Sequence, residues 1–466
     1  MRLKPDLTHS RRKARAIFEE LRREILAGRF SAGEKLPGSR ALAAELGVAR
    51  GTVNMALAML AAEHLIEIHA ASGARVSARL EPPARPKKIP DIHLTAWAGR
   101  LEELSASETP AFFATGQLAD EHFPERDWLH ALRESRRGYG LLHSGVRLSP
   151  AGFLPLRQSI AQHLSYSRGI QASAENIVIV NGSMQALALI CQLLIDKKSR
   201  AAFEDPGFHG IRAAIHATGA RGEACEIDAE GMVLPKRPVR LIFVTPASQF
   251  PKGIAMTLGR RMELLHYARR NNTFVVEDEY DSEFTRLKNP PQPLKLLDRD
   301  ERVIYVGSFS RTMFASLRIG YVLLPDALVT PFLRARRLYD SVPPALTDQM
   351  AMAAFMRAGA YRRHLRRMNK IYSERHDLLL QGLIAHLGER FAFKPSAAGL
   401  SLYARWQGKK ADFQRIREAF QHAGISWQNV ERYFAGKAVD AALFGFSHLS
   451  SAKIAETLAK IRRILA

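Results

Sequence analysis

Apolar residues recur with two different periods along this chain of 466 residues, and the change of period divides it into parts. Near the N-terminus, Ile17, Leu21 and Ile25 lie four residues apart, which is the spacing of one face of a helix. Further on, short apolar runs are bounded by Gly and small polar residues. The pattern of the first part predicts three helices and a two-stranded hairpin, over residues 17–25, 39–46, 50–63 and 65–76.

The turn residues of this first part specify how its helices are joined. Gly47 provides a tight turn between the second and third helices, and Ser39 is expected to be the N-cap of the second. Two short helices joined across a glycine turn form a helix-turn-helix, whose second helix can enter the major groove of DNA. The hairpin that follows would be its wing. Residues 11–79 are therefore predicted to be a DNA-binding domain.

The longer second part alternates helical patterns with short apolar strands. Residues 80–108 separate it from the first part, and 81–90 are rich in proline and basic residues, as expected of an extended linker. From 109 to 466 the alternation predicts an α/β domain with a mainly parallel sheet.

Composition and charge narrow the functional class. The net charge is +22, and residues 1–90 carry 17 Lys/Arg against 9 Asp/Glu, so the excess is denser at the front of the chain. A basic N-terminal domain favours a polyanionic partner, here double-stranded DNA. The two cysteines suit a reducing compartment, and no secretion signal or membrane span is read from the pattern. A cytoplasmic protein without a metal site is expected.

The segment LPGSRALAAELGVARGTV resembles the core pattern LPxSRxLAxxLGVSRxTV of GntR-type winged-helix regulators. The resemblance implies DNA contacts at the matching positions and places the wing tip at a glycine. Without it, the arginines would be ordinary solvated surface charges. The implied DNA-binding residues are Arg40, Arg50, Gly51, Thr52, Asn54 and Gly73.

Three positions depart from that pattern. Gly38 stands where a small polar residue or proline is usual, Ala49 stands where the family has a hydroxyl cap, and Gly51 lies in a contact position. Loss of a hydroxyl cap weakens a helix start by about 1 kcal/mol. The departures predict a weaker cap and one contact fewer.

The segment VIYVGSFSRTMFASLRIGYVLLP, residues 303–325, carries the chemistry of the second part. Two apolar runs flank a Gly/Ser turn, which is a frame for an anion site because small residues let backbone amides approach a phosphate. The segment resembles the cofactor-lysine motif of fold-type I aminotransferases, in the form carried by MocR-type transcriptional regulators. The resemblance implies the fold-type I aminotransferase fold, with residues 393–406 and the closing helix in a small C-terminal α+β domain. That motif reads GSFSK or GTFSK, with an arginine seven residues after the lysine. Here Arg318 follows position 311 by seven, but position 311 is arginine.

Arg311 changes what the resemblance implies. An imine with pyridoxal phosphate needs a primary amine that can lose its proton, whereas a guanidinium stays protonated and forms no such bond. Arg311 is either a drifted position in an inactive site or, with Arg318, a bidentate grip on a phosphate or carboxylate. Lys252 is the one lysine near a cofactor motif that could replace the missing amine.

The remaining cofactor positions follow from the same resemblance. It implies a phosphate site at a helix N-terminus and in the Gly/Ser turn, an aromatic ring stacked on the pyridine, and an acid and a phenol on its ring nitrogen and hydroxyl. Alternatively, Phe208 is a core aromatic and the acidic segment around Asp278 is a solvated loop. The implied residues are Gly182, Ser183, Met184, Phe208, Asp278, Tyr280, Ser308, Ser310, Arg311 and Arg318.

Three readings of function compete. The first is a transcriptional regulator whose aminotransferase-like domain dimerises and senses a small anionic ligand, either noncovalent pyridoxal phosphate or another effector. The second is an active aminotransferase with a DNA-binding domain, which Arg311 disfavours, as does Leu443 at the position expected for the substrate-binding arginine. The third is a ligand-free regulator in which the large domain is a scaffold. We favour the first, a homodimer that is not an enzyme.

Overall fold

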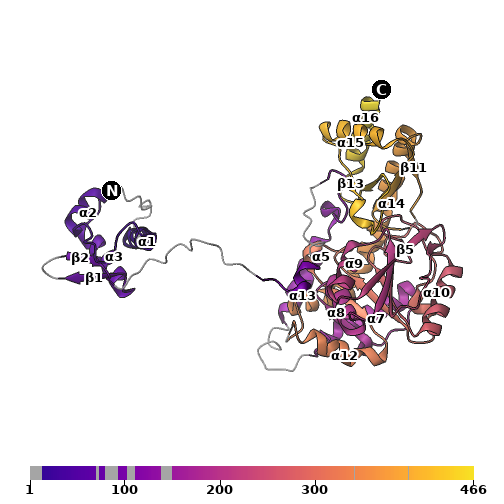
Figure 1. Ribbon diagram of the computed structural model, residues 1–466, viewed down its shortest axis with the longest axis horizontal. Coiled ribbons are helices and arrows are strands. Elements are labelled where there is room, and N and C mark those ends of the chain that lie inside the picture. The colour runs from indigo at the N-terminus through magenta and orange to yellow at the C-terminus, as the bar shows by residue number, and fades with distance from the viewer. Residues whose placement is uncertain are drawn as a thin grey trace. The chain divides into compact units, whose positions relative to one another are not determined.

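The computed structural model describes residues 13–69, 73–78, 93–101, 111–137, 149–340, 342–396 and 398–465. The chain separates into two compact units, Met1–His93 and Leu94–Ala466 (Figure 1). Most of the predicted linker, residues 80–92 and 102–108, lies outside the described residues. Between those stretches the short helix α4 (Ala96–Gly99) is formed.

The first unit contains the predicted helices and hairpin. Apolar side chains from one face of each helix form its core, in which Ile17, Leu21, Val53 and Leu60 are fully buried. The hairpin pairs in antiparallel register, with Ile66 opposite Val76. Its elements are α1 (Lys13–Leu26), α2 (Ser39–Leu46), α3 (Arg50–Ala62), β1 (Ile66–His69) and β2 (Gly73–Val76).

The expected cap at Ser39 is wrong. Helix α2 begins at Ser39 itself, the preceding Gly38 is extended, and no side chain caps the helix. Because Ser39 already lies in the first turn, its hydroxyl faces another partner and accepts a hydrogen bond from Arg50 Nε at 3.2 Å. The expectation for the next helix is confirmed, since Ala49 precedes α3 without a side-chain cap.

Eight strands of the second unit form one sheet in the order β3-β10-β9-β8-β7-β4-β5-β6. The central pairs β4–β5, β4–β7, β7–β8 and β8–β9 are parallel, which confirms the mainly parallel sheet. Strand β10 runs antiparallel to both of its neighbours. The strands are β3 (Ile177–Val180), β4 (Arg200–Asp205), β5 (Arg221–Asp228), β6 (Gly231–Met232), β7 (Leu241–Val244), β8 (Phe274–Glu279), β9 (Val303–Ser308) and β10 (Gly320–Leu323).

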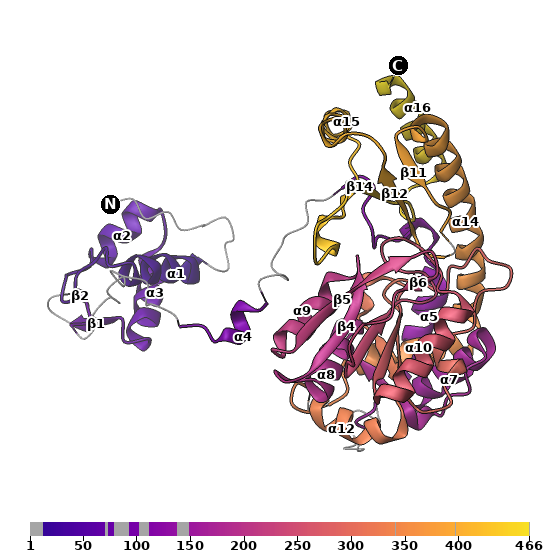
Figure 2. The ribbon, with the colours of Figure 1, turned by 45° about the vertical axis from the view of Figure 1, so that its right-hand side comes forward.

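Helices cover both faces of this sheet (Figure 2), as the continuous apolar strands require. One core packs α8 (Ser183–Leu194), α9 (His209–Ala217) and α12 (Asp326–Arg336) against residues such as Val180, Phe243 and Val306. The opposite cores pack α10 (Leu258–Asn271) and α7 (Leu154–Arg168) against the other face. Further elements are α5 (Glu125–Arg137), α11 (Leu294–Leu297) and α13 (Leu346–Arg357).

A smaller antiparallel sheet follows, in the order β11-β12-β14-β13. The long helix α14 (Ala360–Leu387) contacts both α13 and this smaller sheet, so it connects the part built on the large sheet with the part built on the small one (Figure 2). The elements of this part are β11 (Phe391–Phe393), β12 (Ser401–Trp406), α15 (Lys410–His422), β13 (Gln428–Asn429), β14 (Ala441–Gly445) and α16 (Ser451–Leu465). Among the described helices, none is both long and apolar enough to cross a membrane.

A substitution at Gly445 tests how tightly the small sheet packs on residues 113–115. A Cβ at this position would lie 2.0 Å from the carbonyl oxygen of Ala114, and Gly445 N donates to the carbonyl of Phe113 at 3.0 Å. Since backbone cannot yield as a side chain does, we expect Gly445→Ala to lower the free energy of unfolding by about 1–3 kcal/mol. Urea denaturation measures the loss. Gly436→Ala is the control because a Cβ there meets nothing within 4 Å, and equal midpoints for both variants would contradict this packing.

Candidate functional site

The first candidate surface is the N-terminal turn of α3. Arg50, Gly51 and Asn54 are exposed and Thr52 is half-buried, whereas Val53 on the opposite face is fully buried. Because one face of α3 is buried, the side chains at the start of this second helix of the helix-turn-helix point outward, as contact with DNA bases requires. The predicted positions in α3 are thus brought onto one exposed surface.

Arg40 and the wing supply the other predicted positions. Arg40 is exposed in the first turn of α2, and Gly73 begins β2 with a φ of 87°, a conformation that glycine adopts without strain. The sequence interpretation missed two basic residues beside the wing. Lys35 pairs through its backbone with Arg75 of β2 in an isolated antiparallel bridge, and its side chain lies 3.6 Å from a Cβ built on Gly73. Basic side chains flanking a predicted wing glycine were the signal that could have found them.

The second candidate site forms where three strand ends meet at one edge of the large sheet. Because β10 lies between β3 and β9, Gly320 is opposite both Val180 and Ser308. Segments separated by about 130 residues in sequence therefore end side by side. This register brings Gly182, Ser308 and Arg318 together.

Helix α8 points its N-terminus into this edge. Gly182 precedes the helix with a φ of 85°, and the first amides, of Ser183 and Met184, have no intrahelical acceptor. Arg318, itself in the left-handed region with a φ of 51°, donates through Nη2 to the carbonyl of Asn181 at 3.2 Å. A Cβ on Gly182 would lie 3.0 Å from the same Nη2. The helix N-terminus and a guanidinium thus offer positive charge at one point, which suits an anion.

Ser308 and Ser310 complete this part of the site. Ser308 Oγ accepts from the amide of Ser310 at 3.2 Å, whereas Ser310 Oγ is buried without a hydrogen-bond partner among the described residues. A buried hydroxyl without a partner is uncommon in folded proteins. Its donor is available for a phosphate or carboxylate oxygen.

Beyond the anion site, the acidic segment after β8 is buried. The solvated-loop interpretation is therefore wrong, because the side chains of Asp278, Glu279 and Asp281 are each less than a tenth exposed. Burial, together with the negative charges of Glu279 and Glu204, raises the pKa of the Asp278 carboxyl to about 7, against the opposing charge of Arg311. The sequence interpretation missed Asp281, whose pKa burial also raises against the charge of Arg311.

Arg311 faces these carboxyl groups. Its guanidinium carbon lies 6.0 Å from the centre of the Tyr280 ring, and a Cβ on Gly116 would lie 3.0 Å from its Nη1. Tyr280 itself donates its hydroxyl to the carbonyl of Ser248 at 3.1 Å. A glycine at 116 leaves the room that the arginine fills, and no sequence signal indicated it.

Phe208 lies beside the start of α8. A Cβ on Gly210 would lie 2.6 Å from the Phe208 ring and 2.7 Å from Met184 Sδ, so the ring and the thioether flank the same glycine. The ring is half-buried and packs on two hydrophobic clusters. It therefore has both a core contact and an open side.

Two further positions from the sequence analysis lie elsewhere in the unit: Lys252, the candidate replacement for the missing amine, and Leu443, at the position expected for the substrate-binding arginine. Lys252 Nζ donates to the carbonyl of Ile227 at 2.9 Å and lines a hollow near Glu226, on the side of β5. Leu443 is fully buried in a cluster with Phe250 and Tyr433. The structure gives Lys252 no contact with Asp278 or Arg318, and it gives Leu443 a core role.

Comparison with known proteins identifies both units. Residues 13–76 match the family described as bacterial regulatory proteins, gntR family, and residues 113–428 match aminotransferase class I and II. The chain is 31% identical over 464 residues to the probable rhizopine catabolism regulatory protein MocR of Rhizobium meliloti, covering 96% of this chain and 92% of that protein. It is also 31% identical to the HTH-type transcriptional regulator TauR of Rhodobacter capsulatus, over 95% of this chain and 94% of TauR.

The chain belongs to the MocR-type transcriptional regulators. Solved structures agree on the fold of its second unit. The kynurenine aminotransferase of Pyrococcus horikoshii superposes with a TM-score of 0.68 at 22% identity, covering 80% of this chain and 95% of that one. The α-aminoadipate aminotransferase LysN of Thermus thermophilus gives 0.69 at 24%, covering 80% and 97%. A winged helix followed by a fold-type I aminotransferase fold is thus confirmed.

Arg50 tests the DNA surface of this MocR-type regulator. We expect Arg50→Ala to weaken binding to a DNA fragment selected by the wild-type protein from a random pool by about tenfold to a hundredfold, because an arginine contact to base or phosphate is lost. Fluorescence anisotropy at several salt concentrations measures affinity and salt slope. Arg15→Ala is the control, since Arg15 is exposed on α1 and pairs with Glu19. Unchanged affinity and salt slope for Arg50→Ala would refute the assignment.

Asp278 predicts a dependence of stability on pH. Since its pKa is raised in the folded state, the folded protein holds a proton that the unfolded chain releases between about pH 4 and pH 7. The free energy of unfolding therefore falls as pH rises through this window. Asp278→Asn removes that contribution, so the urea midpoint should fall less between about pH 5 and about pH 7.5 than in the wild type. An equal fall in both would contradict the raised pKa of Asp278; exposed Asp300→Asn is the control.

Proposed function

We propose that this chain is a DNA-binding regulator whose aminotransferase-like unit binds a small anionic ligand without forming a covalent bond to it. Arg311 carries this proposal. It stands where the resemblance implies the imine-forming lysine, and a guanidinium cannot supply that amine. Transamination is therefore not the role we propose for this unit.

The neighbouring residues support retention of a ligand rather than a bare scaffold. Arg318 donates to the carbonyl of Asn181 just before α8, and Ser310, whose buried hydroxyl has no partner among the described residues, lies two residues after Ser308, which pairs with Gly320 beside it. A scaffold has no need of a buried hydroxyl without a partner. An anionic group such as a phosphate or carboxylate would satisfy it.

Pyridoxal phosphate fits these residues in part. Its phosphate would be held by Ser183, Ser310 and Arg318, and its ring would lie against Phe208 with the nitrogen toward Asp278. When bound, it supplies a protonated ring nitrogen that pairs with a carboxylate. Arg311 cannot join it covalently, and its positive charge already faces Asp278 and Asp281. A noncovalent complex, or another anion that leaves Arg311 in place, is what these residues support.

A ligand at this site would regulate DNA binding by favouring one conformation of the protein. We propose that the chain acts as a homodimer in the cytoplasm, where its operator DNA is. The two winged helices would then read two half-sites at a spacing set by the dimer. We propose the same dimeric arrangement for an effector other than pyridoxal phosphate.

Titration of the purified protein with pyridoxal phosphate tests the chemistry of the site. We expect saturable binding to the wild type, no adduct after borohydride reduction, and a covalent adduct in Arg311→Lys, because lysine restores the amine. Absorbance and intact mass measure both outcomes. Lys252→Arg is the control and should behave as the wild type. A reduced adduct in the wild type that Lys252→Arg abolishes would revive the aminotransferase reading.

Arg318 distinguishes a built anion site from surface charge. We expect Arg318→Ala to weaken binding of pyridoxal phosphate by about tenfold to a hundredfold, because a hydrogen bond from a charged group is lost. Exposed Arg299→Ala is the matched control. If the wild type bound neither pyridoxal phosphate nor inorganic phosphate, the scaffold reading would replace ours.

A further inference from the structure

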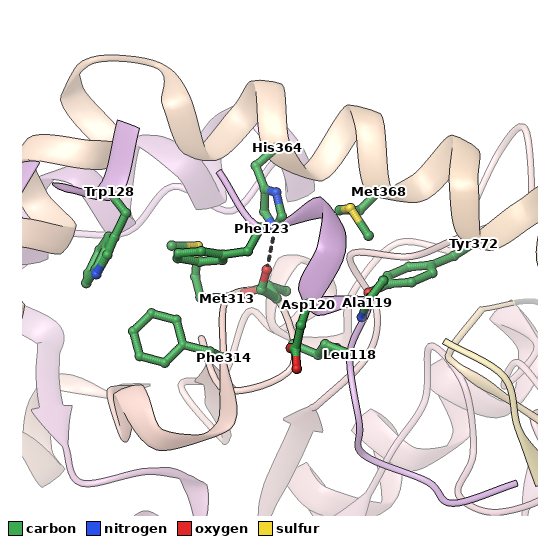
Figure 3. Close-up of a pocket in the computed structure, with 11 residues that line it drawn as sticks. Leu118, Ala119, Asp120, Phe123, Trp128, Met313, Phe314, His364, Met368 and Tyr372 are labelled. Atoms are coloured by element: carbon green, nitrogen blue, oxygen red, sulfur yellow. Dashed lines mark hydrogen bonds between the residues drawn. The ribbon is translucent and has the colours of Figure 1, made fainter. Parts of the chain in front are cut away.

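A second pocket lies beside the segment that follows Arg311. It has a volume of about 310 Å³ and is lined by residues 118–120 and 312–314, by two aromatic side chains near α5, and by α14 (Figure 3). This volume is at the lower end of the range of about 300–1,000 Å³ found for small-molecule sites. Neither the DNA surface nor the anion site uses it.

One wall of this pocket is a stripe along α14. His364, Met368 and Tyr372 are four residues apart and project from successive turns toward Phe123 and Met313 (Figure 3). Hydrogen bonds fix both ends of the wall. His364 Nε2 donates to the carbonyl of Thr312 at 2.8 Å, and the Tyr372 hydroxyl accepts from the amide of Ala119 at 3.3 Å. The pocket is therefore preformed.

The opposite wall is aromatic. Phe314 meets Phe123 at 5.4 Å and Trp128 at 5.5 Å between ring centres, both edge to face. Met313 and Met368 add polarizable sulfur near these rings. Rings already held by edge contacts lose little entropy when another ring joins them, so this wall favours a planar apolar group.

Asp120 is the one acidic or basic residue other than histidine among those that line the pocket. It is exposed there, and within the described residues its carboxylate has neither a hydrogen bond nor an ion pair. Burial lowers the pKa of His364 to about 4, and the charge of Arg367, which donates to the carbonyl of His122 outside the lining, lowers it as well, so the imidazole is neutral at pH 7. A cationic group on the ligand would therefore be favoured over an anionic one.

We propose that this pocket, bounded by α14 and residues 312–314, binds a small amine with an aromatic body, its ring against Phe123 and Phe314 and its ammonium group at Asp120. Thr312 follows Arg311 directly and is fixed to α14 through His364. An amine in the pocket therefore contacts the segment that positions Arg311. Resting on the proposed function, this contact couples amine binding to anion binding, and the coupling is reciprocal.

The test uses 2-phenylethylamine as the probe and 3-phenylpropionate as its anionic counterpart, with calorimetric titration of the full chain. We expect saturable binding of the amine and at least tenfold weaker binding of the acid, a difference of about 1.4 kcal/mol. Asp120→Asn should weaken the amine about fivefold. Glu125→Gln, an exposed acid on neighbouring α5 outside the pocket lining, should leave it unchanged.

Two further variants locate the probe. Met368→Trp should abolish amine binding because the indole fills the pocket. Phe314→Ala should weaken amine binding about tenfold, and the fold should tolerate this truncation more readily than one at a fully buried position because Phe314 is half-buried. No saturable heat with the wild type, or equal affinities of wild type and Phe314→Ala, would overturn the proposal.

A second titration separates the pocket from the anion site. With saturating 2-phenylethylamine, the affinity for pyridoxal phosphate should change about fivefold or more. An unchanged affinity would refute the coupling while the pocket stands. Amine binding by a protein that binds no pyridoxal phosphate or inorganic phosphate would refute the proposed function alone.

Discussion

The close approach of β3, β10 and β9 is the constraint on which the anion site depends. Gly320 lies between the other two strands with no room for a side chain, since a Cβ there would be 3.0 Å from the carbonyl carbon of Gly182 and 3.2 Å from the carbonyl oxygen of Gly307. Only this fit aligns the start of α8 with the Ser308 turn. Arg318, two residues before Gly320, is in a left-handed conformation, and its Nη2 lies 3.0 Å from a Cβ built on Gly182.

Two buried acids on β8, Glu277 and Asp278, are compensated in different ways for the loss of water around their carboxylates. Burying a carboxylate is unfavourable unless it is paired or hydrogen-bonded. Glu277 accepts from the amides of Leu294 and Lys295, each at 2.8 Å, with Arg261 nearby at 3.9 Å, so both of its oxygens have a partner even though burial still raises its pKa. Asp278, one residue later and on the other face of the strand, has Arg311 as its opposing charge. The first acid supports the fold, and the second is left for a ligand or for Arg311 to compensate.

Arg311 lies between the buried acids after β8 and the pocket under α14. Its guanidinium faces the carboxyl groups of Asp278 and Asp281, while the three residues after it form a wall of that pocket. Thr312 is bonded twice to α14: its carbonyl accepts from His364, and its hydroxyl accepts from the Tyr361 hydroxyl at 3.0 Å. A short segment fixed in this way transmits displacement rather than absorbing it, because packed interiors are not continuously deformable.

Periodicity and short motifs in the sequence were sufficient to predict the winged helix, the mainly parallel sheet and the residues at the ends of β3 and β9. These features are local, since helix faces, turns and glycine positions are written in neighbouring residues. The inability of Arg311 to form an imine is likewise a property of the residue itself. Tertiary structure alone decided that the acidic segment at Asp278 is buried, that Ser39 is not a cap, and that Gly116 leaves room for Arg311. Each depends on contacts between residues distant in sequence, whose positions only the packed chain fixes.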